Sequence, residues 1–97
     1  MGGATRLGDY NSGHDSCKPV PLEECSSDVL INGKGAGRQG DKYLQHGCSD
    51  HPMHEDYITS GSSSVYINGK QAASIGDPLN KSGSFVVEGS DNVFIGG

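Results

Sequence analysis

The sequence is poor in the residues from which small domains build a hydrophobic core. It has no tryptophan, only four tyrosines and two phenylalanines, and Leu, Ile, Val and Phe together number 18 in 97 residues. A domain of this size buries only about two thirds of its unfolded surface. Because the net charge is only −5 and the apolar residues recur in a repeated pattern, the composition indicates a thin core and not a disordered chain.

Features typical of membrane, exported and nucleic-acid-binding proteins are also missing. No apolar run approaches the roughly 18 residues of a membrane span, and the start MGGATRLGD lacks the apolar stretch of a signal peptide. We therefore expect synthesis and folding in the cytoplasm. The net negative charge argues against a nucleic-acid partner. Cys17, Cys25 and Cys48 are an odd number without an export signal, so no disulfide framework is expected, and a Cys17–Cys25 bridge is the alternative.

A sixteen-residue segment occurs twice. SSDVLINGKGAGRQGD, residues 26–41, returns as SSSVYINGKQAASIGD, residues 62–77. In each copy two apolar residues alternate with other residues before an Asn-Gly pair, which is the pattern of a strand that enters a two-residue type I′ turn. Each copy therefore predicts a β-hairpin whose returning arm ends at a Gly-Asp turn.

The two ends of the chain supply the halves of a third hairpin. SDNVFIGG, residues 90–97, repeats the outgoing arm, and ATRLGD, residues 4–9, repeats the returning arm. The terminal strands must lie side by side to satisfy their backbone hydrogen bonds. The sequence thus predicts a single all-β domain of residues 1–97, a closed pseudo-threefold β-prism of three hairpin repeats. An open array of two hairpins with frayed ends is the alternative.

The outgoing arms carry two alternating sets of apolar residues. One set must face the interior of the prism, and the other set, if it faces solvent, forms a threefold-related apolar surface of the kind that often marks a partner site. The first set is Val29, Ile31, Val65, Ile67, Val93 and Ile95, and the second is Leu30, Tyr66 and Phe94.

Histidines are concentrated in the loops between the hairpins. The loops, residues 10–26, 42–62 and 78–90, should gather at one end of the prism, and the first two contain all four histidines. The stretch HGCSDHPMH places three of them around a cysteine, with ligand types and spacings that Zn²⁺ prefers. We expect one structural metal ion, Zn²⁺ or a similar ion, held by three histidines plus a cysteine or a fourth histidine. Solvated loop histidines are the alternative. The candidate ligands are His14, His46, Cys48, His51 and His54.

Signatures of catalysis are weak. There is no HExxH motif and no Ser/His/Asp set with an oxyanion-type glycine turn, and a complete ligand set that includes sulfur is typical of a structural site. Glu55 and Asp56 adjoin His54, which leaves a small zinc-dependent hydrolase as an alternative, although both carboxylates are expected to be solvated. GAGRQG, residues 35–40, fits GxGxxG, but no helical pattern follows it. We therefore expect no enzyme.

The three repeats resemble the PAAR-repeat proteins. The resemblance lies in Ala-x-x-x-Gly-Asp, present as ATRLGD, AGRQGD and AASIGD, alternating with VLINGK and VYINGK, and it covers nearly the whole chain. Gly35 and Gln71 replace the proline of the motif. Arginine is kept at Arg6 and Arg38, but the last copy has Ser74. Members of the family look like small cones that sit on the blunt end of a trimeric β-helical spike, with a metal near the apex.

The resemblance also assigns individual metal ligands. HPMHEDYITSGSSSV is similar to the family's Cys-Pro-x-His stretch, with His51 in the place of the cysteine and His54 at the histidine. His14 matches the histidine of the first loop. The family's remaining ligand usually comes from the third loop, where GDPLNKSGSF has neither cysteine nor histidine. We expect Cys48 to replace it, with His46 as the next choice.

The resemblance implies a structural tip that caps and sharpens a trimeric spike in a contractile membrane-puncturing machine, with one tip per trimer. Because the chain ends at its last strand, we expect a phage baseplate spike in the virion, made in the host cytoplasm, and a stand-alone type VI secretion tip is the alternative. The target membrane is touched only transiently, and no homo-oligomer is expected. A metal-responsive binding module that holds its metal weakly is a further competing function.

Overall fold

Short antiparallel strands carry all the regular secondary structure of the described residues. In this computed structural model those residues are 2–14, 17–48 and 51–96, and the side chains of Cys48 and His51 are not described. None of the described segments is a helix of the length and hydrophobicity that a membrane crossing requires. The strand pairs are β1 (Gly2–Gly3) with β8 (Phe94–Ile95), β2 (Leu30–Ile31) with β3 (Lys34–Gly35), β4 (His46–Cys48) with β5 (His51–His54), and β6 (Tyr66–Ile67) with β7 (Lys70–Gln71).

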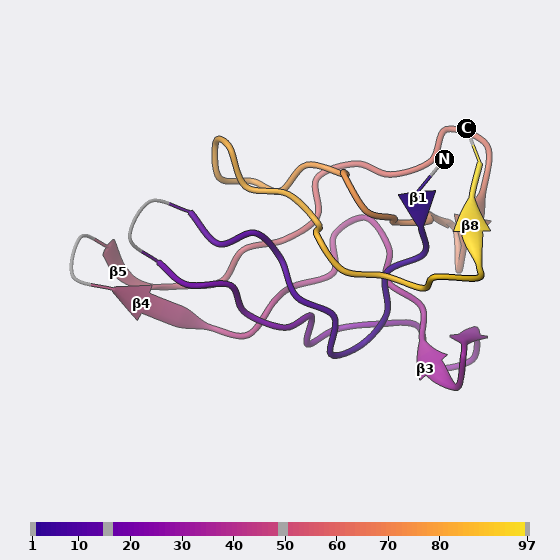
Figure 1. Cartoon of the computed structure of the whole chain (residues 1–97), viewed down its shortest axis with the longest axis horizontal. Coiled ribbons are helices and arrows are strands. Elements are labelled where there is room, and N and C mark those ends of the chain that lie inside the picture. Colours follow the sequence, from indigo (N-terminus) through magenta and orange to yellow (C-terminus); the bar gives the residue numbers. More distant parts are fainter. Residues whose placement is uncertain (1, 15–16, 49–50, 97) are drawn as a thin grey trace.

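The molecule is elongated, with extents of 37 × 24 × 23 Å. Figure 1 shows β4 and β5 at one end of the long axis, and both termini, β1, β8 and β3 at the other end. We call the first end the tip and the second the base.

Both copies of the repeated segment form the same hairpin. Asn32 and Gly33 connect β2 to β3 with φ angles of 54° and 80°, and Asn68 and Gly69 connect β6 to β7 with φ angles of 55° and 77°. Positive φ at both central residues defines a type I′ turn, which matches the twist of the paired strands. The two predicted hairpins are confirmed.

The chain ends form the third hairpin. β1 and β8 are antiparallel, with Gly2 opposite Ile95 and Gly3 opposite Phe94. The predicted pairing of the terminal strands is therefore confirmed, and the open array with frayed ends is excluded.

A ring of three backbone hydrogen bonds closes the returning arms on one another. The N–H of Thr5 donates to the carbonyl of Ala73 at 3.1 Å, Ala73 donates to Gly37 at 3.1 Å, and Gly37 donates to Thr5 at 2.9 Å. The three residues hold the same position in their repeats, so a pseudo-threefold axis passes between them. A Cβ on Gly37 would lie only 2.7 Å from Cγ2 of Thr5, so the close approach requires glycine there.

The core consists of two small apolar clusters, and each receives an equivalent residue from every repeat. The equivalent residues are Ala4, Ala36 and Ala72 in one cluster, with Ile31 and Ile67, and Leu22, Ile58 and Val86 in the other, with Tyr43, Ala73 and Leu79. The isoleucines of the outgoing arms face the core as expected, since Ile31 and Ile67 are buried and Ile95 packs on the same cluster. Val29 and Val93 of the same set are 36% exposed, so the expectation is wrong for them. The all-β, pseudo-threefold prism predicted from the repeats is confirmed.

The last strand provides a test of this closure. Replacing Ile95 by alanine should lower the free energy of unfolding by about 1–2 kcal/mol, less than for a fully buried isoleucine because Ile95 is only partly buried. Phe94→Ala on the opposite face of β8 is the matched control and should change it by less than about 0.5 kcal/mol. Chemical denaturation followed by circular dichroism measures both values. Removal of residues 93–97 should abolish the cooperative transition, and a truncated chain that keeps this transition would contradict the closed prism.

Candidate metal centre

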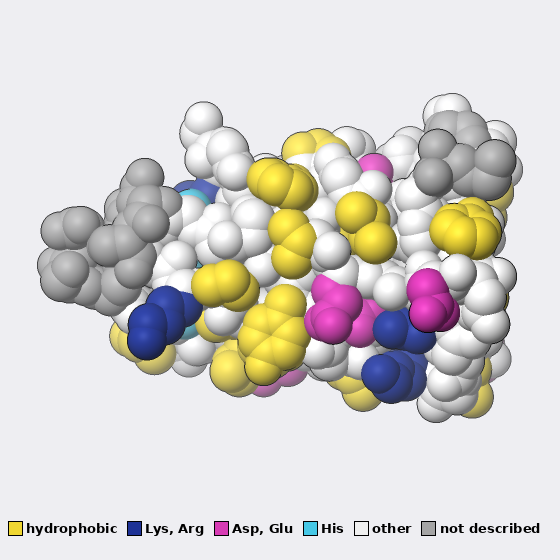
Figure 2. Space-filling view, in the orientation of Figure 1, with side chains coloured by type: hydrophobic (Ala, Val, Ile, Leu, Met, Phe, Trp, Pro, Cys, Tyr) yellow, Lys and Arg dark blue, Asp and Glu magenta, His cyan; other side chains and the backbone are white. Residues whose placement is uncertain are grey.

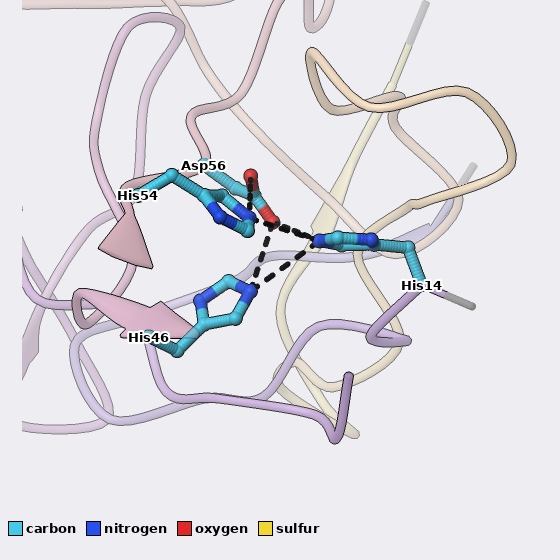
Figure 3. A group of neighbouring side chains, drawn as sticks. All are labelled: His14, His46, His54 and Asp56. Carbon is cyan, nitrogen blue, oxygen red and sulfur yellow. Dashed lines mark hydrogen bonds and ion pairs between the residues drawn. The ribbon is translucent and has the colours of Figure 1, made fainter. Parts of the chain in front are cut away.

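Three histidine rings and one carboxylate converge at the tip. Figure 3 shows the Nε2 atoms of His14, His46 and His54 directed at each other and at Asp56. The Nε2 atom of His14 lies 3.0 Å from that of His54 and 3.4 Å from that of His46. The distances from the Asp56 oxygens to Nε2 are 3.5 Å for His14, 3.7 Å for His46 and 3.3 Å for His54.

The hairpin of β4 and β5 positions two of the histidines. His46 lies opposite His54 in the strand register, so their rings project from neighbouring positions. Nδ1 of His46 is 3.3 Å from the carbonyl of Leu44, and Nδ1 of His54 is 2.8 Å from the carbonyl of Pro52. With Nδ1–H as the donor to these carbonyls, each Nε2 is unprotonated and directs its lone pair into the cluster, as in metal-binding histidines.

An antiparallel bridge in the first loop positions the third histidine. His14 and Cys17 exchange backbone hydrogen bonds, with N···O distances of 3.2 and 2.7 Å. Cys17 is in a disulfide, whereas Cys25 is a free thiol. The expectation of no disulfide is therefore wrong for Cys17, and the Cys17–Cys25 alternative is excluded. The physical reason is distance: Cys25 packs against Gly35 of β3 at the base, whereas Cys17 lies beside the tip cluster.

Asp56 was expected to be solvated, and the structure corrects this. Its side chain is fully buried, and neither carboxylate oxygen accepts a hydrogen bond from an N–H or O–H group of the described residues. The signal in the sequence was strand periodicity, because His54, Asp56 and Ile58 alternate with exposed Glu55 and Tyr57 and so share one face.

The cluster fits a tetrahedral metal ion. A buried carboxylate without hydrogen-bond donors is costly unless a cation neutralises it. In a tetrahedral zinc site with bonds of 2.0–2.1 Å the ligand atoms lie about 3.3–3.4 Å apart. The distances from His14 to the other two histidines and from Asp56 to all three, 3.0 to 3.7 Å, span this value, and all four ligand atoms lie within 4.8 Å of one another. Three imidazoles and one carboxylate complete four positions.

The cluster is also largely shielded from solvent. The side chains of His14, His46 and His54 are 4%, 10% and 17% exposed, and that of Asp56 is 0% exposed. A catalytic zinc keeps one position open for water or substrate, whereas a structural zinc has all its positions filled by protein. The arrangement therefore favours a structural role for a bound ion.

The structure brings together three of the five ligands predicted from the sequence, namely His14, His46 and His54. The side chains of Cys48 and His51 lie outside the described residues, so both stay predictions. Asp56 is the fourth member of the cluster and was not predicted as a ligand.

The sequence matches the model of one protein family, described as the PAAR motif, over residues 21–85 and 49–97. It is 37% identical over 78 residues to the NAD(P)(+) glycohydrolase toxin Tse6 of Pseudomonas aeruginosa strain PAO1. It is equally similar, 37% over 78 residues, to the (p)ppApp synthetase toxin Tas1 of Pseudomonas aeruginosa strain UCBPP-PA14. Each alignment covers 74% of this chain but only 18% and 17% of the two relatives, so the chain spans less than a fifth of their length.

Metal content provides the first test of the centre. Protein purified without chelator should contain about one metal ion per chain by elemental analysis, because the cluster offers one tetrahedral set. Removal of the ion should lower the melting temperature by at least about 10 °C, since binding of a structural ion contributes directly to folding. His54→Ala should have the same effect and Lys81→Ala should not. Metal-free protein with an unchanged melting curve would contradict the site.

Asp56 provides a second and sharper test. Asp56→Asn preserves the shape of the side chain but removes the charge, and should weaken metal binding by at least about tenfold in competition with a chromophoric chelator. Glu55→Gln is the matched control, because Glu55 is the exposed neighbour on the opposite face. Equal affinities of the two variants would show that Asp56 is not a ligand.

Proposed function

Because the chain belongs to the PAAR motif family, we propose that it is a structural spike tip, a single chain that caps the blunt end of a trimeric β-helical spike. The observation that carries the proposal is the closed pseudo-threefold prism, in which one chain offers three similar faces. A threefold partner can be capped by one chain only if that chain has three such faces.

The base carries an exposed apolar set with the same threefold relation. Leu30, Tyr66 and Phe94 are 61%, 57% and 54% exposed, and each stands on the outer face of an outgoing arm. Figure 2 shows one side of the molecule, where charged and apolar side chains are mixed. Acidic and basic side chains lie next to one another toward the base, and apolar side chains are spread along the middle. Exposed apolar groups in equivalent positions support a partner that is itself threefold.

Metal binding would stabilise the tip by cross-linking its loops. The cluster joins the first loop, through His14, to the second loop, through His46, His54 and Asp56. Hydrogen bonds attach the third loop to the other two: the Phe85 carbonyl accepts from the N–H of Ser12, and the Asn80 side chain accepts from the N–H of Tyr57. We propose Zn²⁺ as the ion, because three imidazoles and a carboxylate in a tetrahedral set suit it. A tip held in this way resists deformation during puncture.

The setting that we propose is a bacterial secretion apparatus of type VI. Both relatives are named as toxins of a bacterium, which supports this setting over the phage baseplate spike that was expected first. The virion stays the alternative. We propose no enzymatic activity for these residues, because the four candidate ligands fill a tetrahedral set and their side chains are at most 17% exposed. The zinc-dependent hydrolase predicts an activity that chelator abolishes without loss of the fold, and the tip predicts loss of the fold.

Stoichiometry tests the proposal. Mixed with a candidate trimeric spike fragment, the protein should form a complex of one chain per trimer by size exclusion with light scattering. Phe94→Asp should weaken the complex by at least about tenfold, because it places a charge in the apolar base. Phe85→Asp is the matched control, since Phe85 is an exposed phenylalanine of the third loop. A ratio of three chains per trimer, or equal effects of the two substitutions, would overturn the proposal.

A further inference from the structure

Two repeats hold an arginine against the aspartate that ends the returning arm. Arg6 donates to both carboxylate oxygens of Asp9, from Nε at 2.8 Å and from Nη2 at 3.2 Å. Arg38 donates in the same way to Asp41, at 2.9 Å from both nitrogens. Both pairs are bidentate, the strong geometry for guanidinium and carboxylate.

The third donor of each guanidinium, Nη1, reaches a hairpin turn. Arg6 donates to Oδ1 of Asn32 at 2.9 Å, and Arg38 donates to Oδ1 of Asn68 at 3.0 Å. Each guanidinium therefore donates to one carboxylate and to one additional oxygen acceptor. These bonds join the end of one returning arm to the turn of another hairpin.

The repeat of residues 62–77 keeps the carboxylate but lacks the arginine. Ser74 stands where Arg6 and Arg38 stand, and its N–H donates to Oδ2 of Asp77 at 2.8 Å, as the N–H groups of both arginines do in their own repeats. Among the described residues no cationic side chain pairs with Asp77. Partial burial raises the pKa of Asp77, as expected for a carboxylate that has no counter-charge.

A pocket occupies the place of the missing side chain. It has a volume of about 250 Å³, several times the roughly 30 Å³ that one water molecule occupies in the liquid. Its lining includes Gly61, Ser62, Ser74, Asp77, Ile95 and Gly96.

The second acceptor is also present in this pocket. In the complete site of Arg38, the hydroxyl of Ser26 donates to Oδ1 of Asn68 at 2.7 Å. In the repeat of residues 62–77 the equivalent hydroxyl, that of Ser62, donates to the carbonyl oxygen of Gly96 at 2.6 Å. The Gly96 carbonyl thus takes the place of the asparagine oxygen, and only the guanidinium is missing.

We propose that this pocket binds a guanidinium group, and that the group is an arginine side chain of a partner protein. The planar fork of arginine matches the carboxylate of Asp77 bidentately and reaches the Gly96 carbonyl, which a lysine ammonium cannot do with one atom. Ile75 and Ile95 supply apolar surface for the methylene stem. The pocket adjoins the β1–β8 pair at the base, where the proposed spike docks, but the site itself does not depend on that assignment.

A titration followed by backbone amide NMR tests the pocket in the isolated protein. N-acetyl-arginine amide should cause saturable shifts at residues 74–77 and 96, with a dissociation constant on the order of 10 mM for so small a ligand. N-acetyl-citrulline amide, the neutral analogue of the same shape, should bind at least about tenfold more weakly. Asp77→Asn should abolish the shifts while preserving the bond from the Ser74 N–H. Equal binding of the two probes, or unchanged binding in this variant, would overturn the proposal.

Filling the pocket from within the chain is the complementary test. Ser74→Arg should recreate the bidentate pair of the other repeats, abolish probe binding, and raise the melting temperature by about 4–8 °C. Ser74→Lys is the matched control and should raise it less. If Ser74→Arg still binds the arginine probe as the parent protein does, the pocket is not a guanidinium site. If this variant fails to fold, the site does not accept the group, and the proposal is overturned as well.

Discussion

The structure depends on a ring of three backbone hydrogen bonds that joins Thr5, Gly37 and Ala73 around a pseudo-threefold axis. Each returning arm is too short to form a stable sheet alone, and its amide groups need partners once they are buried. The ring supplies these partners only when all three arms are present. One of them comes from the N-terminus, so the chain must bring its two ends together. The hydrogen bonds between the three arms therefore stabilise this chain with a thin core as much as its apolar packing does.

The cluster of candidate metal ligands is a consequence of this closure. Equivalent arms release their loops in the same direction, so His14 arrives beside the hairpin that carries His46 and His54. Asp56 is then buried among three imidazoles, without an N–H or O–H donor from the described residues. A carboxylate in that position requires a cation. A bound ion would attach the first two loops to each other at the tip.

The repeats share their backbone but differ in the side chains that carry function. Three serines, three glycines and three aspartates recur with the same backbone contacts, whereas only two loops supply histidines and only two repeats supply an arginine. The first difference concentrates the candidate metal ligands in the first two loops, and the second leaves an acidic pocket at the base. The approximate threefold symmetry of the backbone can match a threefold partner. The positions at which the repeats differ provide sites that occur only once per chain.

The sequence by itself determined the hairpins, the pairing of the termini and three of the histidines that converge at the tip. These features depend on local chemistry: Asn-Gly takes the positive φ angles of a type I′ turn, alternation selects the buried face, and a repeat that is split between the termini must be completed across them. Only the tertiary structure decided that Asp56 is buried, that Cys17 rather than Cys25 is in a disulfide, and that the position of the missing arginine is a pocket. Each of these depends on which loops and turns meet, and that is set by long-range packing around the axis and not by neighbours in the sequence.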